Sequence, residues 1–180
     1  NEQILNTLHI RILLEEHSFS KSMRKLLRKN SERFTWHIQP YKITPEKELL
    51  YKKHRIRFKG NSSPNLTAYL FDNYNKNVFN TFEINLYDNG RLVGFSFFDV
   101  GLTSMASIIG IFDQAYEKYS LGIYTMLLEI EYAKSLQLKY YYPGYVAHEP
   151  SQFNYKLRLA EKFDYYDWYT RRWTSFEKRN

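Results

Sequence analysis

The sequence contains no cysteine, and it has only seven glycines and five prolines in 180 residues. Without cysteine these residues cannot form a disulfide, a thiolate metal site, an iron–sulfur cluster or a cysteine nucleophile. No apolar run approaches the roughly 20 residues of a membrane-spanning helix, and the most apolar stretch, residues 92–100, has the length of a strand. Acidic residues interrupt the N-terminus, so it has no signal-peptide pattern. These features are compatible with a cytoplasmic protein, and we expect no membrane partner.

The sequence also lacks the usual patterns of hydrolytic and metal sites. Its five histidines show no metal-ligand spacing, and no serine stands in a nucleophile-elbow pattern. Glu129 and Glu131 are two positions apart on an expected helix and therefore face different ways, which excludes them as a paired-carboxylate site. We expect no metal cofactor and no hydrolase chemistry.

Positive charge is abundant: the formal net charge is +7, and the basic residues are clustered. Residues 20–30 contain five Lys or Arg, and residues 51–59 contain five more together with His54. Such clusters favour a polyanionic partner, because phosphate contacts release counterions. The ordinary alternative is a lysine-rich soluble protein whose charges are simply solvated.

The hydrophobic pattern predicts a mixed α/β domain. We expect strands over residues 8–14, 34–38, 107–112 and 138–146, and a hairpin over 82–100 that turns at Asp88-Asn89-Gly90. Helices are expected over 20–29, 44–58 and 121–137, with Ser20, Thr44 and Ser120 as caps, and another from Ser151. An aromatic tail, residues 163–176, is expected as a last strand. A long helix between two strands suggests a right-handed crossover and a parallel pair. This order predicts an α/β (α+β) acetyltransferase-like (GNAT) fold, with a mostly antiparallel mixed sheet and flanking helices.

Tyrosine is the most unusual component, with 17 residues concentrated near positions 140–145 and 165–169. Most of these rings are expected to fill core and sheet faces. Strand alternation puts Tyr140 and Tyr142 on one face and Tyr141 on the other. Pro143 and Gly144 should disturb pairing in the middle of this strand. A strand that leaves its neighbour there would open a slot where backbone groups and tyrosine hydroxyls meet a ligand.

The expected fold raises acetyl-CoA as a ligand, but the sequence supports it poorly. Acetyltransferases hold the pyrophosphate on backbone N–H groups in a glycine-rich turn at the start of the central helix. Here Gly122 is the one glycine of that turn, and Tyr124 fills the second glycine position. A tyrosine at this position would crowd a pyrophosphate.

Several segments, taken in order, resemble the arginyl-tRNA–protein transferases and their bacterial relatives that transfer leucine. SFSKSMRKLLRKN (18–30) is similar to the family's SxSQRRxLRRN, LYDNGRLVGFSFFDV (86–100) to LYDxGRLVAVGVxDV, and IFDQAY (111–116) to FFDPAY. Residues 120–124 stand where the family has SLGTY, 129–133 where it has EIELA, 138–146 where it has GLPYYYLGYYI, and 153–156 where it has MxYK. The resemblance covers the chain from about Leu8 to its end.

The chain departs from the family pattern at several places. The family's cysteine-bearing N-terminal region is not in this sequence, so we expect one C-terminal transferase domain over residues 1–180, with 1–18 a remnant of the missing region. Ile109 and Gly110 stand where a tyrosine is usual, Gln114 replaces a proline, Pro143 a leucine and Phe153 a methionine. These changes touch the expected cleft and bear on substrate choice and activity.

The resemblance implies transfer of arginine or leucine from aminoacyl-tRNA to the N-terminal α-amine of a protein, which marks that protein for degradation in the N-end rule pathway. Aminoacyl-tRNA is then a co-substrate and no cofactor is needed. Positioning, proton removal from the amine and stabilisation of the oxyanion would suffice. The cleft is expected between the strand ending at Asp113 and the strand of Tyr140–Val146, above Gly122.

The resemblance also suggests roles for individual residues. The expected catalytic residues are Asp113, Glu129 and Tyr142. The expected substrate-binding residues are Leu121, Gly122, Tyr124, Tyr145, Asn154, Tyr155 and Lys156. The expected tRNA-phosphate contacts are Lys21, Arg24 and Arg28. Each has an ordinary alternative: Asp113 as a cap, Glu129 as a solvated helix residue, the basic trio as a solvated face. Two other functions stay open, an acyl-CoA-dependent N-acetyltransferase of the same fold and a non-catalytic tRNA- or protein-binding module.

Overall fold

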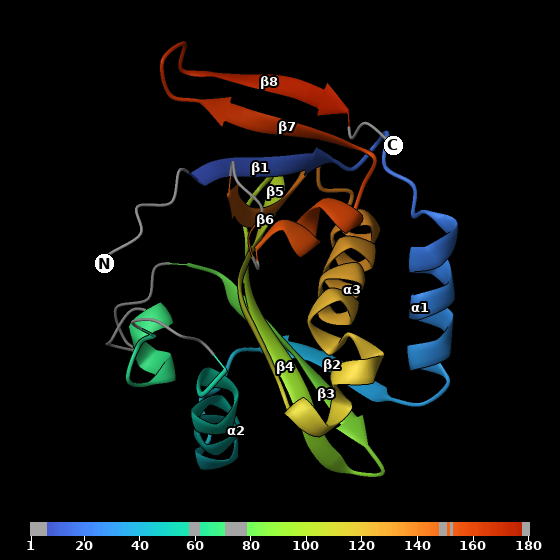
Figure 1. Cartoon of the computed structure of the whole chain (residues 1–180), viewed down its shortest axis with the longest axis vertical. Helices are drawn as coiled ribbons and strands as arrows, with labels where there is room; N and C mark the ends of the chain where they lie inside the picture. Colours follow the sequence, from blue (N-terminus) through green and yellow to red (C-terminus); the bar gives the residue numbers. More distant parts are fainter. Residues whose placement is uncertain (1–6, 58–61, 71–78, 148–150, 152, 178–180) are drawn as a thin grey trace.

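A computed structural model of the chain describes residues 7–57, 62–70, 79–147, 151 and 153–177, and shows one eight-stranded sheet (Figure 1). The strands lie in the order β2-β3-β4-β5-β6-β1-β7-β8, and every neighbouring pair is antiparallel except β5 with β6. Their bounds are β1 Thr7–Leu13, β2 Thr35–Pro40, β3 Thr81–Asp88, β4 Arg91–Val100, β5 Ser104–Phe112, β6 Tyr140–Ala147, β7 Lys162–Asp167 and β8 Arg172–Glu177. The predicted mixed, mostly antiparallel α/β sheet is confirmed.

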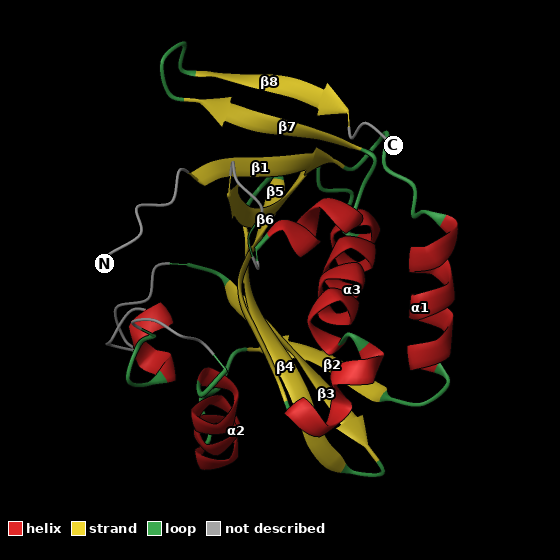
Figure 2. Ribbon diagram, in the orientation of Figure 1, coloured by secondary structure: helices red, strands yellow, loops and turns green. Residues whose placement is uncertain are grey.

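Helices cover both faces of this sheet (Figure 2). α1 (Lys21–Ser31) and α3 (Leu121–Ser135) lie on one side, and α2 (Pro45–Arg55) lies on the other. The described residues also form three 3-10 helices: η1 (Leu66–Tyr69), η3 (Gln114–Tyr119) and η4 (Asn154–Arg158). No helix in the described part of the chain combines the length and apolarity that a membrane crossing requires.

Local sequence signals explain where most elements begin. The hydroxyl of Ser20 accepts a hydrogen bond from the Met23 N–H at 3.3 Å, and Thr44 caps α2 in the same way. Asn89 and Gly90 have φ angles of 50° and 79°, as a tight two-residue hairpin turn requires. The prediction that the Ser120 hydroxyl caps α3 is wrong. Ser120 precedes α3 in a left-handed conformation, and its side chain makes no capping hydrogen bond.

Two other expected elements differ in the structure, and the N-terminal segment takes a defined place. Thr7–Leu13, which are part of the segment expected as a remnant of another region, form β1 between β6 and β7. The aromatic tail forms a hairpin, β7–β8, instead of one strand. α2 ends at Arg55, because Ile56 is its C-cap, and the expected end at Phe58 lies outside the described residues. These features depend on long-range pairing, which sequence periodicity does not specify.

The core has two parts, one on each side of the sheet. The larger part joins β1, β6 and β7 to α3, and α3 is buried on nearly every side, from Leu121 to Ala133. The smaller part packs Leu50 and Tyr51 of α2 against Phe95 and Phe97 of β4. A helix that is buried all round loses the polar stripe of a surface helix. Any carboxylate on α3 that points into the sheet is therefore removed from solvent.

A buried ion pair joins α2 to β3. Lys47 Nζ lies 2.6 Å from Glu83 Oε2, and the two side chains are 5% and 0% exposed. Glu83 also accepts hydrogen bonds from Gln39, Asn85 and the Lys42 backbone N–H. The charge of Glu83 is thus fully surrounded by donors, which is what a buried carboxylate requires.

Candidate functional site

The two parallel strands at the centre of the sheet separate after a short shared stretch. β5 pairs with β6 only from Ser104 to Ala106, opposite Tyr140 to Tyr142. Beyond that point β5 continues along β4, and β6 continues along β1. Pro143 has no N–H to donate, and Gly144 has a φ of 97°, so the backbone of β6 cannot continue the ladder here. The predicted departure of this strand from its neighbour is confirmed.

Glu129 lies on α3 beneath the point where the strands part. Its Oε2 accepts a hydrogen bond from the Tyr141 hydroxyl at 2.7 Å, and its side chain is 0% exposed. The hydroxyls of Ser96 on β4 and Ser107 on β5 also approach the carboxyl group. Glu129 Oε1 and Ser96 Oγ have no hydrogen-bond partner among the described residues. A carboxylate oxygen buried without a donor is costly, so a bound group that supplied a donor would stabilise it.

Burial changes the protonation of this group. Burial raises the pKa of Glu129 to about 7, while the hydrogen bond from Tyr141 and the nearby hydroxyls of Ser96 and Ser107 work in the opposite direction. Burial, followed by the charge of Glu129, also raises the pKa of Tyr141 well above its usual value. A carboxyl group with a pKa near neutrality can both accept and return a proton at physiological pH. The ordinary alternative, a solvated helix residue, is therefore wrong for Glu129.

A cationic group lies beside the departing strand. Lys156 on η4 is 9% exposed, and its Nζ donates to the Tyr145 carbonyl at 3.1 Å. Nζ also lies 4.9 Å from the centre of the Tyr145 ring. Burial lowers the pKa of Lys156 to about 8, and no carboxylate pairs with it in the described part of the chain. A Cβ atom at Gly144 would lie 3.2 Å from Nζ, so the glycine leaves room for this amine.

Tyr155 precedes this lysine on η4 and is close enough to the buried carboxyl group to be affected by its charge. Burial of its hydroxyl, followed by the charge of Glu129, raises the pKa of Tyr155 to about 12, although 38% of the residue surface is exposed. The hydroxyl therefore points inward while part of the ring faces solvent. Tyr145 on β6 also influences this hydroxyl electrostatically. The structure thus gathers Glu129, Tyr145, Tyr155 and Lys156 around the separation of the two strands.

Other predicted residues lie elsewhere or have structural roles. Tyr124 is 0% exposed, and its hydroxyl lies 3.1 Å from Ser31 Oγ on α1, so its side chain points away from this site. Leu121 is a fully buried core residue. Gly122 packs closely: a Cβ atom there would lie 3.3 Å from the ring of Phe112. The structure therefore leaves only the backbone of Leu121 and Gly122 as a means of contacting substrate.

Asp113 takes the ordinary role of a cap. Its Oδ1 accepts from the Ala115 N–H at 3.0 Å, at the start of η3, and its Oδ2 lies 2.6 Å from Arg91. Asn154 likewise fastens η4 to β6, because its amide exchanges hydrogen bonds with both backbone groups of Ala147. Tyr142 lies on the opposite face of β6 from Tyr141, with its ring 5.6 Å from that of Trp173. The structure does not bring Asp113 or Tyr142 to Glu129.

The predicted basic face is present on α1. Lys21, Arg24 and Arg28 are all exposed, while Met23 of the same helix is buried against the core. Arg24 donates to the Phe19 carbonyl, and no carboxylate pairs with these three cations in the described part of the chain. Their charge is therefore available to an anionic partner.

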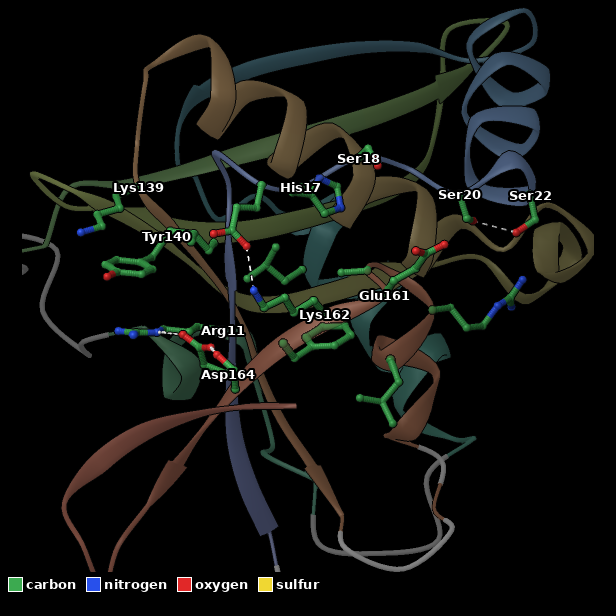
Figure 3. A pocket seen from close by; sticks show the side chains of 18 residues that line it. Arg11, His17, Ser18, Ser20, Ser22, Lys139, Tyr140, Glu161, Lys162 and Asp164 are labelled. Carbon is green, nitrogen blue, oxygen red and sulfur yellow. Dashed lines mark hydrogen bonds and ion pairs between the residues drawn. The ribbon is translucent and has the colours of Figure 1, made fainter. Parts of the chain in front are cut away.

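A pocket of about 800 Å³ lies apart from this site, where β1 leads toward α1 (Figure 3). Four of its seven acidic and basic side chains form ion pairs: Arg11 with Asp164 at 2.9 Å, and Lys162 with Glu16 at 2.8 Å. Burial lowers the pKa of His17, whose Nε2 lies 2.9 Å from the Leu159 carbonyl. No group of three His, Asp or Glu side chains in the described ranges could hold a metal ion. This pocket shows no reactive constellation.

Sequence reasoning missed Ser96, Ser107 and Tyr141 as members of the site. Ser96 stands alone among apolar residues of a buried strand, and a lone polar residue in such a run was the available signal. Tyr141 was placed correctly on its own face of the strand, but its partner could not be identified without the packing of α3. Ser107 had no distinguishing pattern.

Comparison with known proteins gives consistent similarities. Residues 29–164 match the family described as "Arginine-tRNA-protein transferase, C terminus". The chain is 30% identical over 154 residues to an aspartate/glutamate leucyltransferase of Leptospira interrogans, covering 83% of this chain and 60% of that protein. It is 27% identical over 161 residues to the enzyme of the same name from Campylobacter jejuni, with 83% and 64% covered. The chain thus spans about three-fifths of these relatives.

Solved structures show a related fold at low identity. The structure of L-PGS from Bacillus licheniformis aligns with a TM-score of 0.56 and 12% identity, covering 83% of this chain and 49% of that one. A functionally unknown conserved protein from Staphylococcus epidermidis aligns with a TM-score of 0.53 and 9% identity, covering 90% and 58%. At such identities the likeness concerns the fold alone.

Proposed function

Because the chain belongs to the arginine-tRNA-protein transferase C-terminal family, we propose that it transfers an amino acid from aminoacyl-tRNA to the N-terminal α-amine of a protein. The described residues would act as one transferase domain of the acetyltransferase-like (GNAT) type. The short parallel pair β5–β6, the crossover helix α3 and the separation of the two strands support this type of fold. The reaction would take place in the cytoplasm, without a cofactor, and mark the acceptor protein for degradation.

One observation supports the activity most directly: the Oε1 atom of Glu129 is buried without a donor beneath the separated strands. An acceptor α-amine placed there would donate to Oε1. As the amine attacks the ester carbonyl and forms the new C–N bond, the carboxylate would take the proton of the amine. As the acyl C–O bond breaks, the carboxyl group would give this proton to the leaving ribose oxygen of the tRNA. A pKa of about 7 suits this exchange, since the group must be ionised before attack and protonated afterwards.

Lys156 is the residue that we propose to bind the acceptor side chain. It is a buried amine with a pKa of about 8 and no carboxylate partner among the described residues, so an acidic N-terminal residue would complete its pairing. The relatives are named aspartate/glutamate leucyltransferases. We therefore propose leucine as the donated residue and Asp or Glu as the acceptor. Tyr145 and Tyr155 would line this site.

The acetyl-CoA alternative is less well supported. The space beside Gly122 holds the ring of Phe112, and a single residue, Ser120, separates the end of η3 from the start of α3. This leaves no glycine-rich turn of the kind that receives a pyrophosphate. Calorimetry with acetyl-CoA distinguishes the two functions: micromolar binding without any response to charged tRNA would refute the transferase proposal.

The direct test is incubation with labelled leucyl- or arginyl-tRNA and peptides that begin with Asp, Glu, Lys or Arg. We expect label to enter the Asp and Glu peptides from leucyl-tRNA. Label in none of the peptides, with the full-length protein present, would refute the function. Binding of tRNA without turnover would favour the non-catalytic module.

The basic face of α1 is expected to contact tRNA phosphates. Replacing Lys21, Arg24 and Arg28 with Ala should weaken tRNA binding about tenfold or more at low salt, because counterion release is lost. The slope of log affinity against log salt should become shallower by about 1 for each lost contact. A matched control replaces exposed Lys52 and Lys53 on α2, across the sheet. Equal losses from both sets would show that only net charge matters.

A further inference from the structure

The outer half of the sheet has a face that no helix of the described residues covers. On β1, β6 and β7, Ile10, Tyr141 and Phe163 point into the core beside α3. Strand alternation directs the intervening residues to the opposite face. There α2 packs on β4 and β5 and leaves β6, β1, β7 and β8 uncovered (Figure 1). The residues on this uncovered face are His9, Arg11, Tyr140, Tyr142, Tyr166 and Trp173.

Aromatic rings form a continuous band across this face, which we call the aromatic face. The ring of Tyr142 lies 5.6 Å from that of Trp173, which lies 5.3 Å from Tyr166. Tyr166 lies 4.7 Å from Trp168, and Trp168 lies 6.2 Å from His9. All four contacts are edge-to-face, so the rings support one another as a connected group. Trp168 is 64% exposed, and the core does not include any of these side chains.

A guanidinium group is fixed within this band. Arg11 Cζ lies 4.0 Å from the centre of the Tyr140 ring and 4.3 Å from that of Trp173. Asp164 holds the same guanidinium through a 2.9 Å hydrogen bond. Lys139 lies over the Tyr140 ring at 5.2 Å. The face therefore combines partly exposed rings with cations that lie against them.

This combination suits unpaired nucleotides. Bases have flat π faces and phosphates carry charge, and proteins bind single strands with aromatic platforms lined by cations. In a duplex the base faces are already stacked on one another, so they are not available to protein rings. The net charge of +7 favours a polyanion and opposes face-to-face association of two copies of this chain.

We infer that the aromatic face binds unpaired RNA nucleotides. Given the proposed function, on which this identification rests, they are the unpaired nucleotides at the 3′ end of aminoacyl-tRNA. Tyr140 and Tyr142 also belong to the last residues of β6 that pair with β5. A strand stacked on this face therefore leads to the place where the sheet opens above Glu129.

The test uses a fluorescently labelled single-stranded RNA of eight nucleotides that ends in CCA. Trp168→Ala should weaken its binding about 5-fold or more, because one stacking contact is lost. The factor should be similar at about 50 mM and about 200 mM salt, since stacking releases no counterions. Trp36→Ala is the matched control: Trp36 is 40% exposed on β2, at the far end of the sheet. It should leave the affinity unchanged.

A second pair of variants separates stacking from folding. Trp173→Phe keeps a ring beside Arg11, whereas Trp173→Ala removes it, so only the alanine variant should lose binding while both stay folded by circular dichroism. If the alanine variant unfolds, Trp168→Ala decides the question alone. Unchanged affinity in Trp168→Ala, or no RNA binding by the unaltered protein, would overturn the inference. So would a Trp168→Ala variant that lost only self-association or protein binding.

These outcomes are independent of catalysis. Oligonucleotide binding that depends on Trp168 in a protein without transfer activity would support the aromatic face and refute the proposed function. The opposite outcome is transfer activity in Trp168→Ala with an unchanged KM for aminoacyl-tRNA and unchanged oligonucleotide binding. It would support the proposed function and refute RNA binding by the aromatic face.

Discussion

A Glu129→Gln variant is expected to lose about 10²- to 10⁴-fold in transfer rate while becoming more stable than the unaltered protein at pH 8. Glutamine has nearly the same shape and can still accept the hydrogen bond from Tyr141, but it cannot take a proton. The rate is measured with saturating leucyl-tRNA and an Asp-initiated peptide. A purely structural role for Glu129 would leave the rate of the folded variant within a few-fold of the original.

The stability effect has a defined pH dependence. The folded pKa of Glu129 is about 7, against an unfolded value of 4.5. Because the folded pKa is the higher one, the folded state is favoured below pH 4.5, and this advantage disappears as the pH rises to about 7. The size is roughly 3 kcal/mol, since one pKa unit corresponds to about 1.4 kcal/mol. In denaturant unfolding, the free energy of unfolding of Glu129→Gln should therefore increase relative to that of the unaltered protein between pH 5 and pH 8.

The transfer rate should also depend on the ionisation of Glu129. The rate of the unaltered protein should rise with pH up to about 7, where Glu129 becomes ionised. Glu129→Gln should lack this limb and retain only that of the peptide amine, whose pKa is about 8. Glu131→Gln is the matched control, because Glu131 lies two positions along α3 and is exposed. If both variants lose activity equally, the loss does not come from the buried carboxyl group.

Lys47→Met is expected to destabilise the fold by about 3–5 kcal/mol. It removes the one ammonium group bonded to Glu83 and leaves a carboxylate that is 0% exposed without its counter-charge. For a chain of this size, each kcal/mol corresponds to about 2–4 °C in melting temperature. The measurement is urea unfolding at neutral pH, with the midpoint and slope compared with those of the unaltered protein.

The control and the rescue use the same two elements. Lys53→Met on the exposed side of α2 should change stability by less than about 0.5 kcal/mol. In the Lys47→Met background, Glu83→Gln should recover much of the loss, because the uncompensated charge disappears while Gln39 and Asn85 keep an acceptor. An equal loss from Lys53→Met, or no rescue by Glu83→Gln, would show that the ion pair is not the cause.

Much of the fold could be predicted from the sequence because its signals are local. The hydroxyls of Ser20 and Thr44, the turn at Asn89-Gly90 and the break at Pro143-Gly144 act through neighbouring backbone atoms. The position of β1 could not be predicted, because its partners lie more than 120 residues away. Alternation in a strand specifies its faces but not its neighbours.

The site was harder to predict than the fold. Glu129 was selected through its resemblance to a family motif, but its burial depends on α3 being enclosed on all sides, which no pattern near Glu129 reveals. Tyr124 shows the converse: helical spacing placed it near the start of α3 but could not determine that its ring faces α1. Whether a helical residue points toward a site depends on the direction of the helix over the sheet.

The position of β1 also constrains how the chain can fold. Ile10 and Ile12 precede every other strand of the sheet in the sequence, yet they pair with Gly144, Tyr141 and Tyr165. Closing so long a loop slows folding, and the apolar strand has no partner until most of the chain has left the ribosome. During synthesis β2 to β5 can assemble as a meander, whereas β1 must wait. The step that inserts β1 also completes the sheet around the separated strands, so the candidate site is assembled last.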